Sequence, residues 1–344
     1  SGSGTFLNTL TLSNIGEIMF AVPYSTATKL NRYLLSSSSS SCCRTAAIAF
    51  FSSTAIPPEP SIDVSAFQAT LTNLAPSISK SLTTNGYYAT PEPYSILPEH
   101  SIQTMREQSI HLRNIGRFEQ SWSEKIDTSG KVTRFDKEGV FACEPDGQDY
   151  HDAPDLILYL SVMLQTLPDL LNSQSQQDDA VEFGLSASSF NAKLAVTSPG
   201  GSVYPLHIDN PQGLSAGDTR RLTCILYMNP DYQDGVDGGE LRIFCGGGGS
   251  SSTTTSSSDD GNTADEAKKK KDDVVDITPD GGRMVLFWSD EIPHEVLPTA
   301  PTADKLDEMR DRYALTVWIP TDYYHTIHNP DSKFAHLGDE AFTK

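Results

Sequence analysis

Two histidines and one aspartate are the residues whose types and spacing point most directly to chemistry. His207 and Asp209 lie two positions apart, and His294 follows much later in the chain. In an extended backbone, side chains two apart face the same way, so His207 and Asp209 can reach one metal ion from a strand end. Two imidazoles and one carboxylate suit iron(II) and leave coordination positions open for other ligands. The pattern predicts a metal site with these three residues as ligands.

Arg312 adds a cation at the head of the segment RYALTVW, residues 312–318. Strand alternation places Arg312, Thr316 and Trp318 on one face. A guanidinium on an inward face is costly unless an anion pairs with it, and arginine binds carboxylates through two parallel hydrogen bonds. A dicarboxylate such as 2-oxoglutarate is a suitable anion, and Thr316 and Tyr227 could contribute hydroxyl groups to the same carboxylate. The alternative is a structural salt bridge between Arg312 and an Asp or Glu.

Composition excludes several classes of protein. The chain has 344 residues and a net charge of −20, so its surface repels phosphate backbones and nucleic acid is not expected as a partner. The one basic run, residues 268–271, reads as a solvated loop. The five cysteines show no paired spacing, which favours a reducing, intracellular compartment. The apolar run at residues 46–51 is too short to cross a membrane.

The first half of the chain predicts a tail followed by a helical region. Residues 1–60 read as a tag remnant and then a segment that, from Met19 to Pro58, contains no acidic residue. That composition suits an organellar transit peptide, and an ordinary disordered tail is the alternative. Residues 61–177 form the helical supporting region. Helices are expected over residues 62–83, 98–114 and from 152 through 167, with hairpin-like material between the last two.

Short alternating strands with turns between them dominate residues 178–322. They are found in the segments FNAKLAVTS, SVYPLHI, RLTCILYMN, GELRIF, GRMVLFWSD and RYALTVWIP. Regular short strands of this kind predict a mainly β jelly-roll barrel that packs against the N-terminal helices. Residues 246–273 are low in complexity and lie between two strands, so we expect a disordered insert there, and residues 323–344 read as a C-terminal tail.

Several motifs recur in an order that resembles the HIF-type prolyl 4-hydroxylases, the PHD/EGLN-like branch of the 2-oxoglutarate- and iron(II)-dependent dioxygenases. They are HIDNPQG, RRLTCILYMNPDY, GGELRIF, VLFWSDEIPHEV and RYALTVW, and the resemblance covers residues 85–319. It implies a double-stranded β-helix (a cupin-like jelly roll) that hydroxylates a proline of a protein substrate, linked to oxygen sensing. It also implies Fe(II), 2-oxoglutarate and O2, with ascorbate as reductant, and a cytoplasmic or nuclear location.

By the same resemblance, each candidate residue receives a role. His207, Asp209 and His294 are similar to the iron ligands of the family. The positions of Arg312, Tyr227 and Thr316 match contacts to the distal carboxylate of 2-oxoglutarate, and those of Tyr204, Arg220 and Trp318 match residues beside the substrate proline.

One departure from the family concerns the cosubstrate. The family has Tyr-Pro-Gly upstream of the metal motif, where this chain has Ser198-Pro199-Gly200, which leaves the binding of 2-oxoglutarate open. The alternatives are a hydroxylase of small molecules or of other amino acids, a nucleic-acid demethylase, a zinc hydrolase and a barrel that only binds. A demethylase usually carries a second Arg six positions after the first, where this chain has Trp318.

Overall fold

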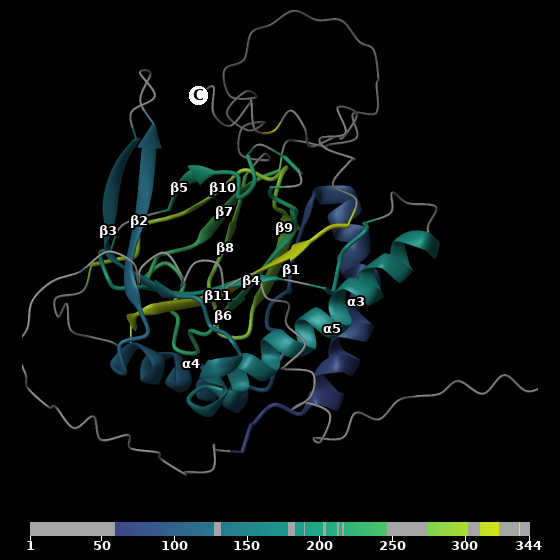
Figure 1. Cartoon of the computed structure of the whole chain (residues 1–344), viewed down its shortest axis with the longest axis horizontal. Helices are drawn as coiled ribbons and strands as arrows, with labels where there is room; N and C mark the ends of the chain where they lie inside the picture. Colours follow the sequence, from purple (N-terminus) through teal and green to yellow (C-terminus); the bar gives the residue numbers. More distant parts are fainter. Residues whose placement is uncertain are drawn as a thin grey trace, which may run out of the picture. The chain divides into compact units, whose positions relative to one another are not determined.

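The computed structural model describes residues 59–126, 132–177, 183–188, 190–201, 204–211, 213–214, 217–245, 274–301, 310–322 and 337 (Figure 1). Three predictions therefore lie outside the described residues: the tag and transit-like segment over residues 1–58, the low-complexity insert 246–273 with its basic run, and nearly all of the tail 323–344. The proposed boundaries between the regions of the chain stay predictions.

Helices form where the sequence predicted them. They are α3 (Val64–Asn85), α4 (Glu99–Asn114) and α5 (Pro154–Gln177), with a 3-10 helix η1 (Gly147–His151) before α5. The N-cap of α3 is Asp63, whose carboxylate accepts a hydrogen bond from the backbone of Ala66, and the helix ends at Gly86, whose φ of 80° lies in the left-handed region. No helix in the described part of the chain is long and apolar enough to cross a membrane.

The helices pack against each other and against one face of the larger sheet. The ring of Phe67 in α3 stacks on that of Tyr159 in α5, with 5.5 Å between the ring centroids. The Trp288 indole at the end of strand β9 donates a hydrogen bond to the Leu82 carbonyl of α3. Figure 1 shows α3 and α5 together on the same side of the strands. The helices thus give the larger sheet a rigid apolar backing, and its other face is available for the site.

Two antiparallel sheets make up the β part. The strands are β1 (Tyr87–Ala89), β2 (Glu119–Ile126), β3 (Val132–Cys143), β4 (Asn191–Thr197), β5 (Tyr204–His207), β6 (Arg220–Tyr227), β7 (Leu241–Phe244), β8 (Val274–Ile277), β9 (Met284–Trp288), β10 (His294–Val296) and β11 (Arg312–Pro320). The larger sheet has the order β1-β9-β6-β11-β4-β3-β2, and the smaller has the order β5-β10-β7-β8.

Alternation along the strands of the larger sheet separates two sets of side chains. On β4, the fully buried Leu194 and Val196 belong to the core, whereas Lys193, Ala195 and Thr197 lie on the opposite face, toward the smaller sheet. Residues of both sheets meet in this space, because the ring of Phe287 on β9 lies 4.4 Å from that of His294 on β10. The predicted double-stranded β-helix with flanking helices is confirmed.

Candidate metal and cosubstrate site

The three predicted metal ligands lie together at one end of the smaller sheet. His207 is the last residue of β5, and it pairs directly with His294, the first residue of β10. Asp209 follows β5 after one residue. One ligand atom from each side chain lies within 4.8 Å of the others, and Asp209 Oδ1 is 3.5 Å from His207 Nε2 and 3.7 Å from His294 Nε2. Residues distant in sequence thus form one cluster with the ligand set predicted for iron(II).

Backbone carbonyls orient both imidazoles. His207 Nδ1 lies 2.8 Å from the carbonyl oxygen of Pro205, and His294 Nδ1 lies 3.1 Å from that of Ile292. A carbonyl only accepts hydrogen bonds, so each Nδ1 carries a proton and each Nε2 is the nitrogen that faces the cluster. This is the tautomer that a metal-binding histidine needs.

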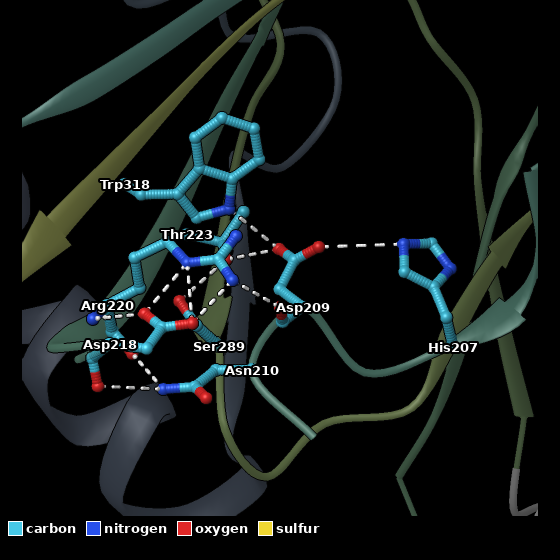
Figure 2. A network of polar contacts seen from close by, with 8 residues as sticks. All are labelled: His207, Asp209, Asn210, Asp218, Arg220, Thr223, Ser289 and Trp318. Carbon is cyan, nitrogen blue, oxygen red and sulfur yellow. Dashed lines mark hydrogen bonds and ion pairs between the residues drawn. The ribbon is translucent and has the colours of Figure 1, made fainter. Parts of the chain in front are cut away.

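Residues of the larger sheet hold the carboxylate of Asp209 from the other side. Asp209 Oδ2 accepts hydrogen bonds from Thr223 Oγ1 at 2.7 Å and from Trp318 Nε1 at 2.9 Å. The Ser289 hydroxyl in turn lies 2.8 Å from Thr223 Oγ1. Figure 2 shows Asp209 between these side chains and His207. Because Oδ2 is occupied by two donors, Oδ1 is the oxygen that faces the imidazoles and is free to bind a cation.

The electrostatics keep the cluster in its metal-binding protonation state. Burial alone would raise the pKa of Asp209, but the two histidines and the Trp318 hydrogen bond outweigh it and hold this pKa well below its usual range. Burial, aided by His207, lowers the pKa of His294 to about 4, although the Asp209 charge acts in the opposite direction. At neutral pH the aspartate is therefore ionised and His294 is uncharged.

Arg312 begins β11 and is 8% exposed. Its Nε donates to the carbonyl of Gly239 at 2.8 Å, and its guanidinium carbon lies 4.9 Å from the centroid of the Tyr227 ring. Gly239 has a φ of 78°, and a Cβ there would come within 2.8 Å of Arg312 Cδ, so this position requires glycine. Among the described residues, no carboxylate lies within 4.0 Å of the Arg312 guanidinium.

The buried hydroxyl of Tyr227 indicates that the space beside Arg312 can bind a polar ligand. Tyr227 is fully buried, and its hydroxyl has no hydrogen-bond partner of good geometry among the described residues. Burial raises the pKa of Tyr227, and the neighbouring Arg312 partly offsets this. The Tyr227 hydroxyl and the Arg312 guanidinium are two neighbouring donors without a carboxylate partner among the described residues. Together they could bind one terminal carboxylate of a cosubstrate. The structural salt bridge considered for Arg312 finds no partner within the described part of the chain.

Strand register shows where Ser198 lies relative to Arg312. On β4, Thr197 is the residue directly opposite Arg312, and it lies on the same inward face. The Ser198 backbone instead bonds to Gly139 and to the Thr299 hydroxyl at the end of the strand. Thr197 is therefore the β4 residue that faces Arg312, and Ser198 lies at the strand end. The effect of Ser198 on the binding of 2-oxoglutarate stays a prediction.

The three residues predicted to lie beside the substrate, Tyr204, Arg220 and Trp318, lie in two different places in the structure. Trp318 and Arg220 support Asp209, since the Arg220 Nη2 donates to the Asp209 carbonyl at 2.8 Å and Asp218 neutralises the same guanidinium. Tyr204 lies at the far end of β5 from His207, away from this network. A role toward substrate stays a prediction for all three.

Sequence reasoning missed Thr223 and Ser289. Thr223 was identifiable in part, because it lies four residues before Tyr227 on the same strand and therefore shares its inward face. Ser289 carries no such signal, since it follows β9 and meets Thr223 only through the pairing of β6 with β9.

Comparison with known proteins agrees with this geometry. Residues 192–320 match the model of the 2OG-Fe(II) oxygenase superfamily. Over 128 residues, the chain is 36% identical to Egl nine homolog 1 of Rattus norvegicus and 34% identical to prolyl hydroxylase EGLN3 of Mus musculus. These alignments cover 37% of this chain and 27% and 38% of the two relatives. The chain therefore spans well under half the length of the curated relatives it matches.

A solved structure shares the fold. It is a prolyl hydroxylase from Trichoplax adhaerens in complex with a hypoxia inducible factor oxygen degradation domain peptide fragment. The TM-score is 0.53 at 21% sequence identity, and the match covers 78% of this chain and 97% of that one. In sequence, residues 192–320 are thus similar to the 2OG-Fe(II) oxygenase superfamily and, within it, to the Egl nine prolyl hydroxylases.

Proposed function

We propose that the protein is a 2-oxoglutarate- and Fe(II)-dependent dioxygenase that hydroxylates a prolyl residue of a protein substrate and releases succinate and CO2. The observation that carries the proposal is the cluster of His207, Asp209 and His294, whose ligand atoms lie within 4.8 Å of one another. Hydrogen bonds to the other polar atom of each side chain, Nδ1 of the histidines and Oδ2 of the aspartate, hold the three in place. Arg312, buried without a carboxylate partner among the described residues, supports 2-oxoglutarate as the cosubstrate.

The residues of the chain contribute positioning and charge. His207 and His294 present Nε2, and Asp209 presents Oδ1, so the three would hold iron(II) on one side and leave the opposite side accessible. When bound, iron(II) with 2-oxoglutarate supplies the oxidising chemistry that activates O2. Arg312 and Tyr227 hold the distal carboxylate of 2-oxoglutarate away from water, and this fixes the direction in which its keto acid points.

Thr316 takes part in the same pocket by its place on β11. It lies four residues after Arg312 and two before Trp318, on the inward face between the cosubstrate anchor and the support of Asp209. A hydroxyl at this position can donate a hydrogen bond to 2-oxoglutarate. Along this one strand, Arg312 would thus contact the distal carboxylate, Thr316 the middle of 2-oxoglutarate, and Trp318 the metal ligand Asp209.

Substrate and reductant are proposed from the relatives, and location from the cysteines. A protein or peptide containing proline is the proposed substrate because the matched relatives are described as prolyl hydroxylases, and ascorbate is proposed as the reductant by the same likeness. An intracellular location, in the cytoplasm, the nucleus or an organelle, is supported by Cys143, Cys224 and Cys245, none of which forms a disulfide.

The proposal is tested by mass spectrometry of proline-containing peptides incubated with the protein, Fe(II), ascorbate and labelled 2-oxoglutarate. We expect succinate release together with one added oxygen on proline. His207→Ala should abolish both, whereas His100→Ala, which removes an exposed histidine of α4, should leave both unchanged. Equal turnover by wild type and His207→Ala, or oxygen added only to free small molecules, would show that the proposed function is wrong.

A further inference from the structure

Two lysines converge on Tyr204, the first residue of β5. The Nζ of Lys137, on β3, lies 3.6 Å from the centroid of the Tyr204 ring, and the Nζ of Lys193, on β4, lies 5.7 Å from it. The two ammonium groups are therefore less than about 10 Å apart, which is the range where like charges still repel at physiological salt. One aromatic face can stabilise one cation, but it does not compensate two.

These lysines differ from several other cations of the described chain. Arg113, Arg117, Arg221 and Arg242, for example, each contact a carboxylate. Within the described residues, neither Lys137 nor Lys193 has a carboxylate within 4.0 Å, although the protein carries a net charge of −20. Burial, and then the neighbouring Lys193, lowers the pKa of Lys137 to about 8, so the Lys137 ammonium group is still largely charged at neutral pH.

Lys193 and Tyr204 are each tied to the proposed site by their strands. Lys193 pairs directly with Thr316 of β11, so it shares the inward face on which Arg312 and Trp318 lie. The Tyr204 hydroxyl is buried and has no hydrogen-bond partner among the described residues. Tyr204 and the metal ligand His207 are the two ends of β5, which places them roughly 10 Å apart along the strand.

We propose that Lys137, Lys193 and Tyr204 form a subsite that binds a carboxylate of the substrate, supplied by an acidic side chain within about three residues of the target proline. Two converging ammonium groups and one unpartnered hydroxyl are donors without an acceptor, and a carboxylate accepts hydrogen bonds from all three. An extended peptide advances about 3.3 Å per residue, so the length of β5 corresponds to about three residues of substrate. The inference rests on the proposed function, and it specifies which sequences that function would select.

Peptide binding tests the subsite without requiring turnover. Fluorescence anisotropy is measured for labelled proline peptides in which one flanking position carries Asp or its neutral counterpart Asn. The protein is kept with manganese(II) and 2-oxoglutarate in the absence of oxygen. We expect wild type to bind the preferred Asp peptide about ten to a hundred times more tightly than its Asn counterpart, since hydrogen bonds to charged groups contribute on this scale.

Charge variants identify the residues responsible. Lys137→Gln and Lys193→Gln should each remove most of the preference for Asp, whereas Lys80→Gln, the same change at an exposed position of α3, should keep it. Lys193→Glu should bind a Lys peptide better than the Asp peptide. Equal binding of Asp and Asn peptides, or binding of none of them, would overturn the subsite.

Kinetics separate this subsite from cosubstrate binding and from the proposed function as a whole. In turnover, Lys193→Gln should raise the KM for an acidic peptide and leave the KM for 2-oxoglutarate within about twofold of wild type. A raised KM for 2-oxoglutarate alone would assign Lys193 to the cosubstrate, and equal rescue by free dicarboxylic acids would assign it to a small-molecule substrate. Turnover of proline peptides without any acidic preference would refute the subsite and leave the proposed function standing.

Discussion

Replacing Thr223 with valine should weaken metal binding although Thr223 is not a metal ligand. Its hydroxyl donates to Asp209 Oδ2 over 2.7 Å, and Thr223 is 1% exposed while the Asp209 side chain is 10% exposed. A hydrogen bond to a charged group is worth about 1.5–3 kcal/mol, but Trp318 Nε1 stays on the same oxygen at 2.9 Å and keeps the carboxylate oriented. We therefore expect a loss near the lower limit of this range, which corresponds to a roughly tenfold lower metal affinity. Removing a residue that hydrogen-bonds to a metal ligand usually has an effect of this size.

The assay is titration of metal-free protein with manganese(II) against a competing chelator, followed by electron paramagnetic resonance of the free ion. Thr223→Ser keeps the hydroxyl and should restore affinity, and Trp318→Phe combined with Thr223→Val should lose about a hundredfold because Oδ2 then lacks both donors. Thr316→Val is the matched control, since Thr316 shares the inward face and, among the hydrogen bonds of the described residues, makes none to Asp209. Affinity of Thr223→Val within twofold of wild type, or an equal loss in Thr316→Val, would refute the reasoning.

Three further outcomes follow from the same contacts. Arg312→Gln should raise the KM for 2-oxoglutarate about a hundredfold with little change in metal affinity, measured by succinate release; an unchanged KM would contradict the anchor. Arg106→Met should lower the free energy of unfolding in urea by about 3–5 kcal/mol, because Arg106 is 3% exposed and donates to the Met228 and Asp311 carbonyls and the Asn229 side chain. For metal-free protein, the pKa of His294 is about 4 folded against 6.5 unfolded, so the unfolded chain binds the extra proton between these values and stability rises with pH across them. Wild type should then show a steeper rise than His294→Gln, by up to about 1.4 kcal/mol per pH unit in urea unfolding, and parallel curves would contradict this.

Local patterns were sufficient to predict most of the fold. The apolar spacing of α3 and the glycine at its end come from interactions within one helix. Alternation identified β4, β6, β9 and β11 because successive side chains of a strand point to opposite faces. Strand β10 has three residues, which is too short for any period to appear. The position of His294 in this strand was therefore known only from its neighbours in sequence.

Contacts between strands account for what the sequence did not reveal. Which residue of β4 faces Arg312 depends on register, and a shift of one residue exchanges Thr197 for Ser198. The Thr223–Ser289 contact depends on the pairing of β6 with β9, and the convergence of Lys137 and Lys193 on Tyr204 involves strands of both sheets. The metal ligands were predictable because their residue types are specific for the chemistry, whereas hydroxyl and ammonium groups occur in too many other roles.

The most direct test of the central claim is visible absorption of metal-free protein after anaerobic addition of iron(II) and then 2-oxoglutarate. Because His207, Asp209 and His294 converge within 4.8 Å and Arg312 lies buried nearby without a carboxylate partner in the described chain, wild type should develop the charge-transfer band of an iron(II)–2-oxo acid chelate. His207→Ala should not develop it, and Arg312→Gln should require far more 2-oxoglutarate. A wild-type protein without the band, or a His207→Ala variant with the same band, would contradict the account.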